Sequence, residues 1–487
     1  MNQEIKTILI KLFEDWSGEE TRSFTALPAS GSYREYYRIS GREKSALGVF
    51  NNDSRENIAF LSFSKALRKA NLPVPKVYGE LIEKQVYLIE DLGDITLFSF
   101  MQGIRKDKNF PQELTEFYKK VLAHLIQFQL NGAECIDFDL CYPRHAFDRQ
   151  SMMWDLHYFK YYFLKLARIP FDEQLLEDDF NSFCDFLLEA EDNFFLYRDF
   201  QSRNIMVVND QPVFIDYQGG RKGALQYDVA SLLYDAKADI PESVREQLLE
   251  YYIGELGEVH QVDKKKFLNH YYGFVLIRLM QAMGAYGFRG FYEKKEHFLQ
   301  SIPLALNNLK YLLDHVRLPV ELPNLMKMLV AVIESENLKY IVSDHQNLTV
   351  SIHSFSYKKG IPVDVSGNGG GFVFDCRAIH NPGRYPEYQD KTGMDTEVIE
   401  FLEKESDVAQ FLEGVYGLVD QSVEKYLARE FKHLMVNFGC TGGQHRSVYC
   451  AEQLGEHLLA KYKVNVNIKH VEQESRQIKS RDSENKV

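Results

Sequence analysis

The chain has 487 residues, of which 45% are hydrophobic and 13% aromatic, and its formal net charge is −13. This length exceeds what one ordinary hydrophobic core can fill, so it predicts about two to four domains. The composition is that of a globular protein and excludes extended disorder. The acidic balance argues against a protein that coats nucleic acid along its whole surface.

The cysteines and the apolar runs indicate the compartment. Six cysteines occur without a CxxC pair or metal-finger spacing, which predicts free thiols in a reducing environment. Residues 1–16 have the pattern of a short amphipathic helix without the apolar centre of a signal peptide. No uninterrupted apolar run approaches the length of a membrane span. We therefore expect a cytoplasmic protein.

Two strand-like segments flank a turn of small residues between Leu27 and Ile39. The backbone N–H groups of Ser30, Gly31 and Ser32 can approach a phosphate closely because small side chains leave room. A plain hairpin turn would have the same composition. Only the position of this turn, ahead of the chemistry-bearing segment described below, favours nucleotide binding.

The next strand-like run, residues 46–50, contains no Lys. Glu56 lies near the start of the helix that follows, and this strand offers it no basic partner. We predict that Arg34 or Arg38, on the preceding hairpin, supplies the positive charge that bound phosphates require. These three side chains are assigned to nucleotide binding.

A further strand over residues 86–90 ends in an acidic break that Gly93 closes. Beyond it, apolar residues recur at intervals of three and four, which predicts a lobe of helices; these stretches are residues 112–128, 154–166 and 172–191. Arg278 and Arg289 lie in a later helical stretch. They could bind an acidic substrate, although structural or solvated arginines are the simpler interpretation.

A β-hairpin is predicted between residues 205 and 215, because two apolar, strand-like runs flank the turn signal Asn209-Asp210. Pairing about that turn sets Asn204 opposite Asp216 at the open end. Asp199 lies on the loop that enters the hairpin. Two carboxylates and an amide can therefore surround one small volume.

Oxygen ligands of this kind suit Mg²⁺, which usually takes one or two carboxylates together with phosphate oxygens. Phosphoryl transfer needs a group that accepts the hydroxyl proton and a metal that bridges the phosphates. We predict that Asp199 is the base and that Asn204 and Asp216 hold Mg²⁺ with ATP. Each residue alone would be an ordinary turn or capping residue; the three at this spacing favour a phosphotransferase.

The run from Tyr197 to Asn204, with the hairpin and Asp216, resembles the aminoglycoside phosphotransferase and choline kinase family. That family has His-x-Asp-x-x-x-x-Asn before the hairpin, and Tyr197 stands at the His position. The resemblance implies an α+β, protein-kinase-like bilobal domain. Its N-lobe would span about residues 1–90 and its C-lobe about 91–317.

The same resemblance implies further roles. The hinge that meets adenine would pass through Glu90, Asp91 and Leu92, although the two acids are equally well solvated or capping groups. Asp228 would brace the catalytic loop. The chain looks most like the branch that phosphorylates the amino sugars N-acetylmuramate and N-acetylglucosamine at the anomeric hydroxyl in cell-wall recycling.

Beyond residue 345, strand-like and helical segments alternate, which predicts a second, smaller α/β domain. A strand-like run over residues 434–438 leads into a Gly-rich loop and then a helix from about residue 448. Unpaired N–H groups and the helix dipole converge at such a loop and make it an anion site. The residues assigned to this phosphate site are Cys440, Thr441, Gly442, Gly443, His445, Arg446 and Ser447.

Two interpretations of this loop compete. Cys440 and Arg446 fit the Cys-x5-Arg spacing of cysteine phosphatases, but Gly439 replaces the preceding His and no general-acid loop is evident. The loop, with Asp375-Cys376-Arg377 and Asn381-Pro382-Gly383, more closely resembles the C-terminal domain of the RapZ adaptor family over roughly residues 347–472. That resemblance implies binding of an amino-sugar phosphate and, more weakly, of RNA, since the tail after Lys461 is only mildly basic.

We therefore expect a kinase-like domain over residues 1–317, a helical linker over 318–345, a RapZ-like domain over 346–472 and a charged tail over 473–487. The predicted function is ATP- and Mg²⁺-dependent phosphorylation of a small-molecule hydroxyl, with an amino sugar as the favoured acceptor and a sugar phosphate bound by the second domain. The alternative is a pseudo-kinase adaptor that binds nucleotide and sugar phosphate or small RNA without catalysis. The missing strand Lys favours the adaptor, and the Asp199, Asn204 and Asp216 set favours the enzyme.

Overall fold

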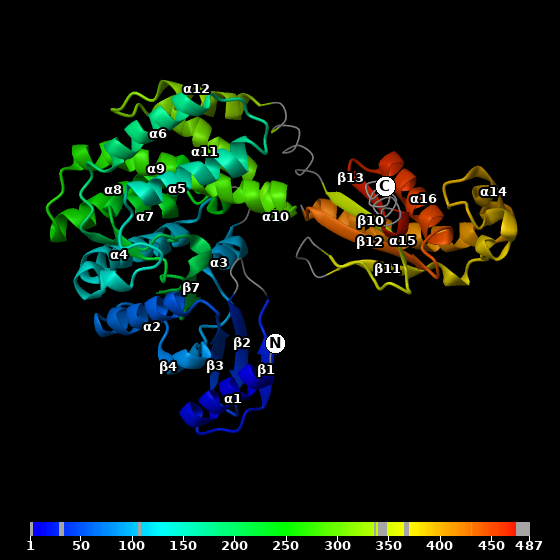
Figure 1. Cartoon of the computed structure of the whole chain (residues 1–487), viewed down its shortest axis with the longest axis horizontal. Coiled ribbons are helices and arrows are strands. Elements are labelled where there is room, and N and C mark those ends of the chain that lie inside the picture. Colours follow the sequence, from blue (N-terminus) through cyan, green and yellow to red (C-terminus); the bar gives the residue numbers. More distant parts are fainter. Residues whose placement is uncertain are drawn as a thin grey trace, which may run out of the picture. The chain divides into compact units, whose positions relative to one another are not determined.

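The structure, a computed structural model, describes residues 3–28, 34–105, 109–335, 338, 348–364, 370–429 and 431–473. The chain forms two compact units, each with its own sheet (Figure 1). The first contains Met1–Phe288 and Pro303–Glu334, and the second contains Arg289–Ile302 and Ser335–Val487. Ser30, Gly31 and Ser32 lie outside the described residues.

An antiparallel five-stranded sheet, in the order β1-β2-β3-β5-β4, forms the N-lobe of the first unit. Helix α1 packs Ile5, Leu9 and Phe13 against this sheet, because these residues recur along one side of the helix. The elements are α1 (Gln3–Ser17), β1 (Ser23–Ala26), β2 (Glu35–Ser40), β3 (Ser45–Phe50), α2 (Ser54–Lys69), β4 (Val77–Leu81) and β5 (Val86–Glu90).

Helices make up most of the rest of the first unit, as the apolar periodicity predicted (Figure 1). They are α3 (Leu97–Ile104), α4 (Gln112–Cys135), α5 (Arg149–Phe159), α6 (Glu173–Leu187), α7 (Leu225–Leu233), α8 (Glu242–Val259), α9 (Lys264–Tyr286), α11 (Ile302–His315) and α12 (Pro323–Glu334). Helix α12 falls in the stretch expected to be a linker. It packs on α6, where the backbone N–H of Leu325 donates to the Asp179 carboxylate over 2.7 Å.

Two short antiparallel strand pairs position the residues of the predicted catalytic segment. Strands β6 (Phe194–Leu196) and β9 (Arg221–Gly223) pair with each other, as do β7 (Ile205–Val208) and β8 (Gln211–Phe214). Asn209 and Asp210 join β7 to β8 with φ values of 49° and 58°. Both values are positive, as a two-residue hairpin turn requires, which explains why Asn and Asp occupy it.

A parallel sheet in the order β11-β12-β10-β13 forms the centre of the second unit. Every residue of β12 is buried, as expected for a central strand of a parallel sheet. Sequence reasoning found β10, β11 and β12 but not β13. The elements are β10 (Thr349–Ser356), β11 (Phe372–Asp375), α14 (Thr396–Glu405), α15 (Val408–Ala428), β12 (His433–Cys440), α16 (Arg446–Lys461) and β13 (Asn465–His470), and the short α10 (Glu296–Leu299) belongs to the same unit.

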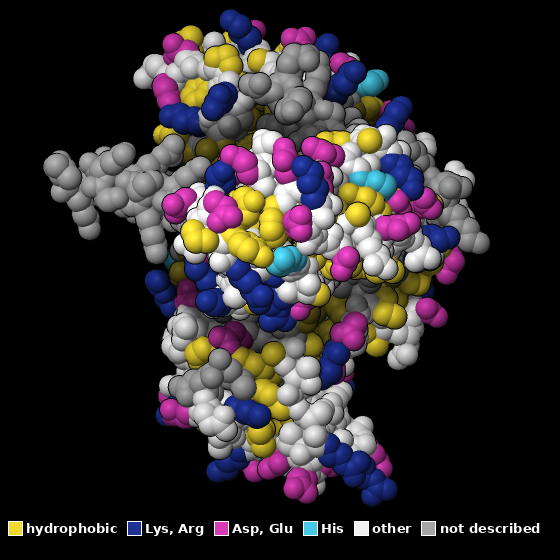
Figure 2. All heavy atoms as spheres, turned by 90° about the vertical axis from the view of Figure 1, so that its right-hand side faces the viewer, with side chains coloured by type: hydrophobic (Ala, Val, Ile, Leu, Met, Phe, Trp, Pro, Cys, Tyr) yellow, Lys and Arg dark blue, Asp and Glu magenta, His cyan; other side chains and the backbone are white. Residues whose placement is uncertain are grey.

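The surface carries charges of both signs. Figure 2 shows Lys and Arg side chains gathered beside a hydrophobic patch near the centre of the face that it draws, with Asp and Glu scattered around them. Within the described part of the chain, no helix combines the length and the apolar character needed to cross a membrane.

Candidate functional site

The β7–β8 hairpin brings the predicted metal ligands together, but by a register that differs from the predicted one. The Ile215 N–H donates to the Asn204 carbonyl over 3.0 Å, so Asn204 faces Ile215 rather than Asp216. Asp216 leaves the strand with a φ of 70°, and this turn of the backbone returns its carboxylate to Asn204. An ideal ladder about the two-residue turn Asn209-Asp210 already pairs Asn204 with Ile215, as observed, so the predicted pairing was wrong by one residue.

Asn204 connects the other two residues of the set. Its Nδ2 donates to the main-chain carbonyl of Asp199 over 2.9 Å and to Asp216 Oδ2 over 3.2 Å. Gln218 Nε2 donates to the other Asp216 oxygen over 2.7 Å. Desolvation by the surrounding atoms, and then the negative charge of Asp199, raise the pKa of Asp216 above its ordinary value, although the residue is exposed to solvent. The two acids therefore repel each other.

The donor set fits a hard divalent cation. Among the described residues, no group of three or more His, Cys, Asp or Glu side chains is arranged to hold a metal. A metal here would depend on Asp216, the Asn204 amide oxygen and phosphate oxygens, which is how Mg²⁺ is usually bound in phosphotransferases. A cation at this point would also relieve the repulsion between Asp199 and Asp216.

Asp199 and Asp216 are both accessible to solvent. The Asp199 side chain is 43% exposed, and Arg278 Nη2 lies 3.9 Å from its Oδ1, at the limit of an ion pair. Arg278 is held in place by Ser231, whose Oγ accepts from its Nε over 2.9 Å, and by Gln281. Arg278 is therefore next to the predicted base. The structure ties Arg289 to Glu293 instead, over 3.0 Å.

Asp228 braces the loop that carries Asp199. Its two carboxylate oxygens accept from the backbone N–H groups of Tyr197 and Arg198 over 2.7 and 3.0 Å. Burial raises the pKa of Asp228 to about 7, although these two hydrogen bonds act in the opposite direction. Tyr197, at the family's His position, donates from its hydroxyl to the Ile215 carbonyl over 2.7 Å and so joins the loop to the hairpin.

Arg198 contributes a second brace that sequence reasoning missed. It has a φ of 84°, and its guanidinium donates to both oxygens of Asp155 on α5 over 2.8 and 2.6 Å. A buried, bidentate ion pair of this kind holds a strained backbone in place. No sequence signal connects two residues 43 positions apart, so a single sequence could not reveal the pair.

The structure gives Arg34 and Arg38 different partners. Arg34 is buried and contacts Glu56 on α2, with 3.0 Å between Nη2 and Oε1. Its positive charge also acts on Asp216 and lowers that pKa. Arg38 instead donates to Asp91 and Asp94, with distances of 2.8–3.1 Å. Arg34, which precedes β2, is thus the buried basic partner of Glu56.

The hinge residues have mainly structural contacts. Asp91 accepts from Arg38, from Ser45 Oγ over 3.2 Å and from the Gly93 N–H over 3.1 Å. Glu90 exchanges hydrogen bonds with Lys76 over 2.9 and 3.1 Å, and Leu92 is half-buried. The acidic side chains therefore fix the path of the hinge, while its backbone is the part that an adenine would meet.

In the second unit, the loop from β12 to α16 encloses Cys440. Its sulfur lies 3.1 Å from the Gly443 N and 3.2 Å from Ser447 Oγ. Burial opposes ionisation, but these hydrogen bonds hold the pKa of the Cys440 thiol below its ordinary value. Gly443 has a φ of 67°, and a Cβ there would lie 2.9 Å from the Ser356 backbone N. Only Gly fits this turn.

The charged residues of this loop have partners within the unit. Arg446 Nη1 donates to the carbonyls of Arg377 and Ile379, each over 2.9 Å, and His445 Nε2 lies 2.8 Å from the Tyr388 carbonyl. We predicted both as donors to an anion. Thr441 and Gly442, which precede α16, are the exposed residues of this loop.

Comparison with known proteins agrees with this division. Residues 23–262 match the phosphotransferase enzyme family, and residues 348–474 match the RapZ C-terminal domain. The chain thus carries a phosphotransferase-family domain followed by a RapZ-type domain. The predicted α+β kinase-like fold with a smaller α/β domain is confirmed.

Individual relatives cover parts of the chain. A nucleotide-binding protein of Fervidobacterium nodosum is 41% identical over 128 residues, which are 26% of this chain and 44% of that protein. One of Thermotoga neapolitana is 38% identical over 130 residues, 27% of this chain and 44% of that protein. The chain spans less than half the length of these curated relatives.

Solved structures resemble the chain at low identity. Choline kinase LicA from Streptococcus pneumoniae is 15% identical with a TM-score of 0.42, covering 64% of this chain and 100% of that one. The ADP-bound aminoglycoside phosphotransferase APH(2'')-Ib is 14% identical with a TM-score of 0.43, covering 68% of this chain and 99% of that one.

Proposed function

We propose that the first domain is an ATP- and Mg²⁺-dependent kinase of a small-molecule hydroxyl. The observation that carries this proposal is the set of Asp199, Asn204 and Asp216, which Asn204 joins by hydrogen bonds and in which both acids are accessible to solvent. The buried Arg34–Glu56 pair supports it, because it supplies a cation where β3 has no Lys.

Each residue of the proposed site has its own role. Asp199 accepts the proton of the acceptor hydroxyl, since its carboxylate is accessible, whereas the Asp216 oxygens accept hydrogen bonds from Asn204 and Gln218. Asp216 and Asn204 hold the metal, which, when bound with ATP, neutralises charge on the phosphates. Arg34 faces the phosphates from the N-lobe, and Asp228 keeps the Asp199 loop in position through its two backbone hydrogen bonds.

The favoured acceptor is an amino sugar, and the second domain binds a sugar phosphate at the loop between β12 and α16. The first part depends on the likeness of the catalytic segment to amino-sugar kinases. The second depends on the exposed residues Thr441 and Gly442, in the loop before α16, and on the match to the RapZ C-terminal domain. A domain that senses amino-sugar phosphate is a sensible companion to a kinase that produces one.

The adaptor alternative has one observation in its favour, the absence of a Lys in β3. The Arg34–Glu56 ion pair weakens this argument for the adaptor, because it supplies a cation beside Glu56. RNA binding by the basic tail is also part of that alternative, and residues 474–487 lie outside the described residues. A gel shift with a flat response to salt would speak against phosphate contacts and hence against RNA.

Acceptor-dependent release of ADP tests the proposal. The purified chain is incubated with ATP and Mg²⁺ and with N-acetylmuramate, N-acetylglucosamine, choline or an aminoglycoside in turn, and the phosphorylated position of any product is located by NMR. We expect turnover with an amino sugar and loss of turnover with EDTA. ATP binding without ADP release from any acceptor would favour the adaptor.

A further inference from the structure

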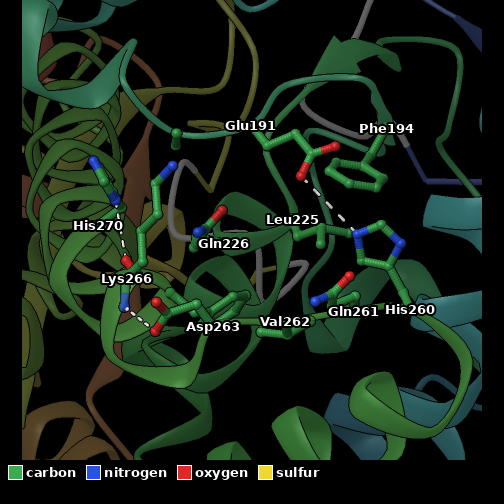
Figure 3. A pocket seen from close by; sticks show the side chains of 12 residues that line it. Glu191, Phe194, Leu225, Gln226, His260, Gln261, Val262, Asp263, Lys266 and His270 are labelled. Carbon is green, nitrogen blue, oxygen red and sulfur yellow. Dashed lines mark hydrogen bonds and ion pairs between the residues drawn. The ribbon is translucent and has the colours of Figure 1, made fainter.

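A pocket of about 80 Å³ lies on the C-lobe, between the start of α7, the start of α9 and β6 (Figure 3). Its floor is buried and largely apolar, with Phe194, Leu225 and Phe267. Its rim carries exposed charged residues. The volume has room for a molecule of a few heavy atoms. The residues already assigned to phosphoryl transfer do not line it.

Two buried acceptor atoms in the floor have no hydrogen-bond partner. Gln226 Oε1 and His270 Nε2 are both unpaired, on side chains whose residues are 7% and 5% exposed. His270 Nδ1 lies 3.1 Å from the Lys266 carbonyl, so Nδ1 carries the proton and Nε2 offers a lone pair in the neutral ring. Buried polar atoms of native proteins are almost always paired, so these two atoms are available to a donor that enters the pocket.

Charges around the pocket are mostly negative. Glu191 lies at the rim, 4.0 Å from His260 Nε2, and Glu189 Oε2 lies 3.8 Å from His270 Nε2. Asp263 adds a further acid, and Lys266 is the one basic side chain among the lining residues apart from the two histidines. Such a site attracts a small cation that can donate hydrogen bonds.

The pocket adjoins the brace of the catalytic loop. Phe194 begins β6, which leads directly to Tyr197, and Gln226 lies two residues before Asp228 on α7. Asp228 accepts from the Tyr197 and Arg198 N–H groups. An occupant would therefore touch both segments that this brace joins.

We propose that this pocket binds a small primary ammonium compound, whose N–H groups donate to Gln226 Oε1 and His270 Nε2 while its charge is balanced by Glu191 and Glu189. The site is separate from the proposed phosphotransferase centre. Binding requires neither ATP nor an acceptor alcohol, so it can be tested whether or not the proposed function holds.

Isothermal titration calorimetry of the full chain with ethylammonium chloride tests the proposal. Ethylammonium has no hydroxyl and cannot be an acceptor for phosphate. We expect saturable, one-site binding in the millimolar range, and none by tetramethylammonium, which has the same charge but no N–H donor. Absence of saturable binding of ethylammonium, or equal binding of tetramethylammonium, would overturn the proposal.

Single-residue variants test whether ethylammonium binds in this pocket. Gln226→Leu removes an unpaired acceptor, so it should melt no lower than the unaltered chain but bind ethylammonium at least tenfold more weakly. Glu191→Gln, on the exposed rim, should weaken binding several-fold without affecting folding. Gln247→Leu, at an exposed position of α8, and Asp199→Asn should bind normally. Unchanged affinity in both Gln226→Leu and Glu191→Gln, or loss in Asp199→Asn, would place the ligand elsewhere and overturn the proposal.

Discussion

The two predicted phosphate sites differ in where their charged side chains point. In the first unit, Asp199 and Asp216 are both accessible to solvent, so charged oxygens are available where the reaction is proposed to occur. In the second unit, Arg446 and His445 hydrogen-bond to carbonyls of their own unit, and the backbone of Thr441 and Gly442 is what remains exposed. Exposed side chains suit chemistry, whereas a rigid backbone loop suits recognition.

Removal of the proposed base in the first unit should cause the largest loss of activity. Asp199→Asn should lower acceptor-dependent ADP release by about 10²–10⁴-fold, because the hydroxyl proton loses its acceptor. Asp210→Asn, on the exposed turn of the same hairpin, is the matched control and should leave the rate unchanged. Near-normal turnover by folded Asp199→Asn would remove Asp199 from the role of base.

The brace at Asp228 should make the first unit sensitive to pH. Burial raises the pKa of Asp228 from 3.8 to about 7, so the folded chain binds this proton more tightly than the unfolded chain. Its contribution to the free energy of unfolding is complete below about pH 4 and is lost as pH rises through about 7, by at most about 1.4 kcal/mol per pH unit. The stability difference between Asp228→Asn and the unaltered chain should therefore change across this window.

Urea unfolding between pH 4 and 8 measures that difference. Trp16 and Trp154 are the two tryptophans of the chain, and both belong to the first unit, so their fluorescence reports on it. A stability difference that is the same at every pH would contradict the assignment of this titration to Asp228.

Arg34 and Arg38 allow a direct comparison of two basic residues of the N-lobe as contributors to ATP binding. Arg34→Met should raise the KM for ATP about tenfold or more, since it removes a buried cation that faces Asp216. Arg38→Met should have a smaller effect, because its guanidinium is already bound to Asp91 and Asp94. Steady-state kinetics with varied ATP compare the two, and equal KM values in both variants would show that Arg34 has no special role.

A single added methyl group should destabilise the loop between β12 and α16 in the second unit. Gly443→Ala should destabilise this unit by about 1–2 kcal/mol, since φ at this position is positive. Gly414→Ala, at an exposed position of α15 in the same unit, is the matched control, because a Cβ there meets nothing within 4 Å. Differential scanning calorimetry with and without glucosamine-6-phosphate should show weakened ligand stabilisation only in Gly443→Ala. Equal behaviour of the two variants would argue against a rigid loop as the binding element.

Local patterns predicted the elements that carry the sites. The β7–β8 hairpin follows from Asn209-Asp210 between apolar runs, and the strand–loop–helix around Cys440 follows from a buried run and Gly residues. These predictions succeed because turn chemistry and apolar periodicity are properties of neighbouring residues. The predicted partner of Asn204 was one residue out of register, and the contact of Asn204 with Asp216 depends instead on the bend at Asp216.

The sequence by itself determined which residue types are available: two carboxylates and an amide around one hairpin, and a Gly-rich loop before a helix. Only the tertiary structure decided that Arg34 rather than Arg38 pairs with Glu56, that Arg198 is held by Asp155, and that Arg446 turns toward Arg377. The physical reason is that long, charged side chains reach partners far away in sequence, and burial decides which of several possible pairs forms.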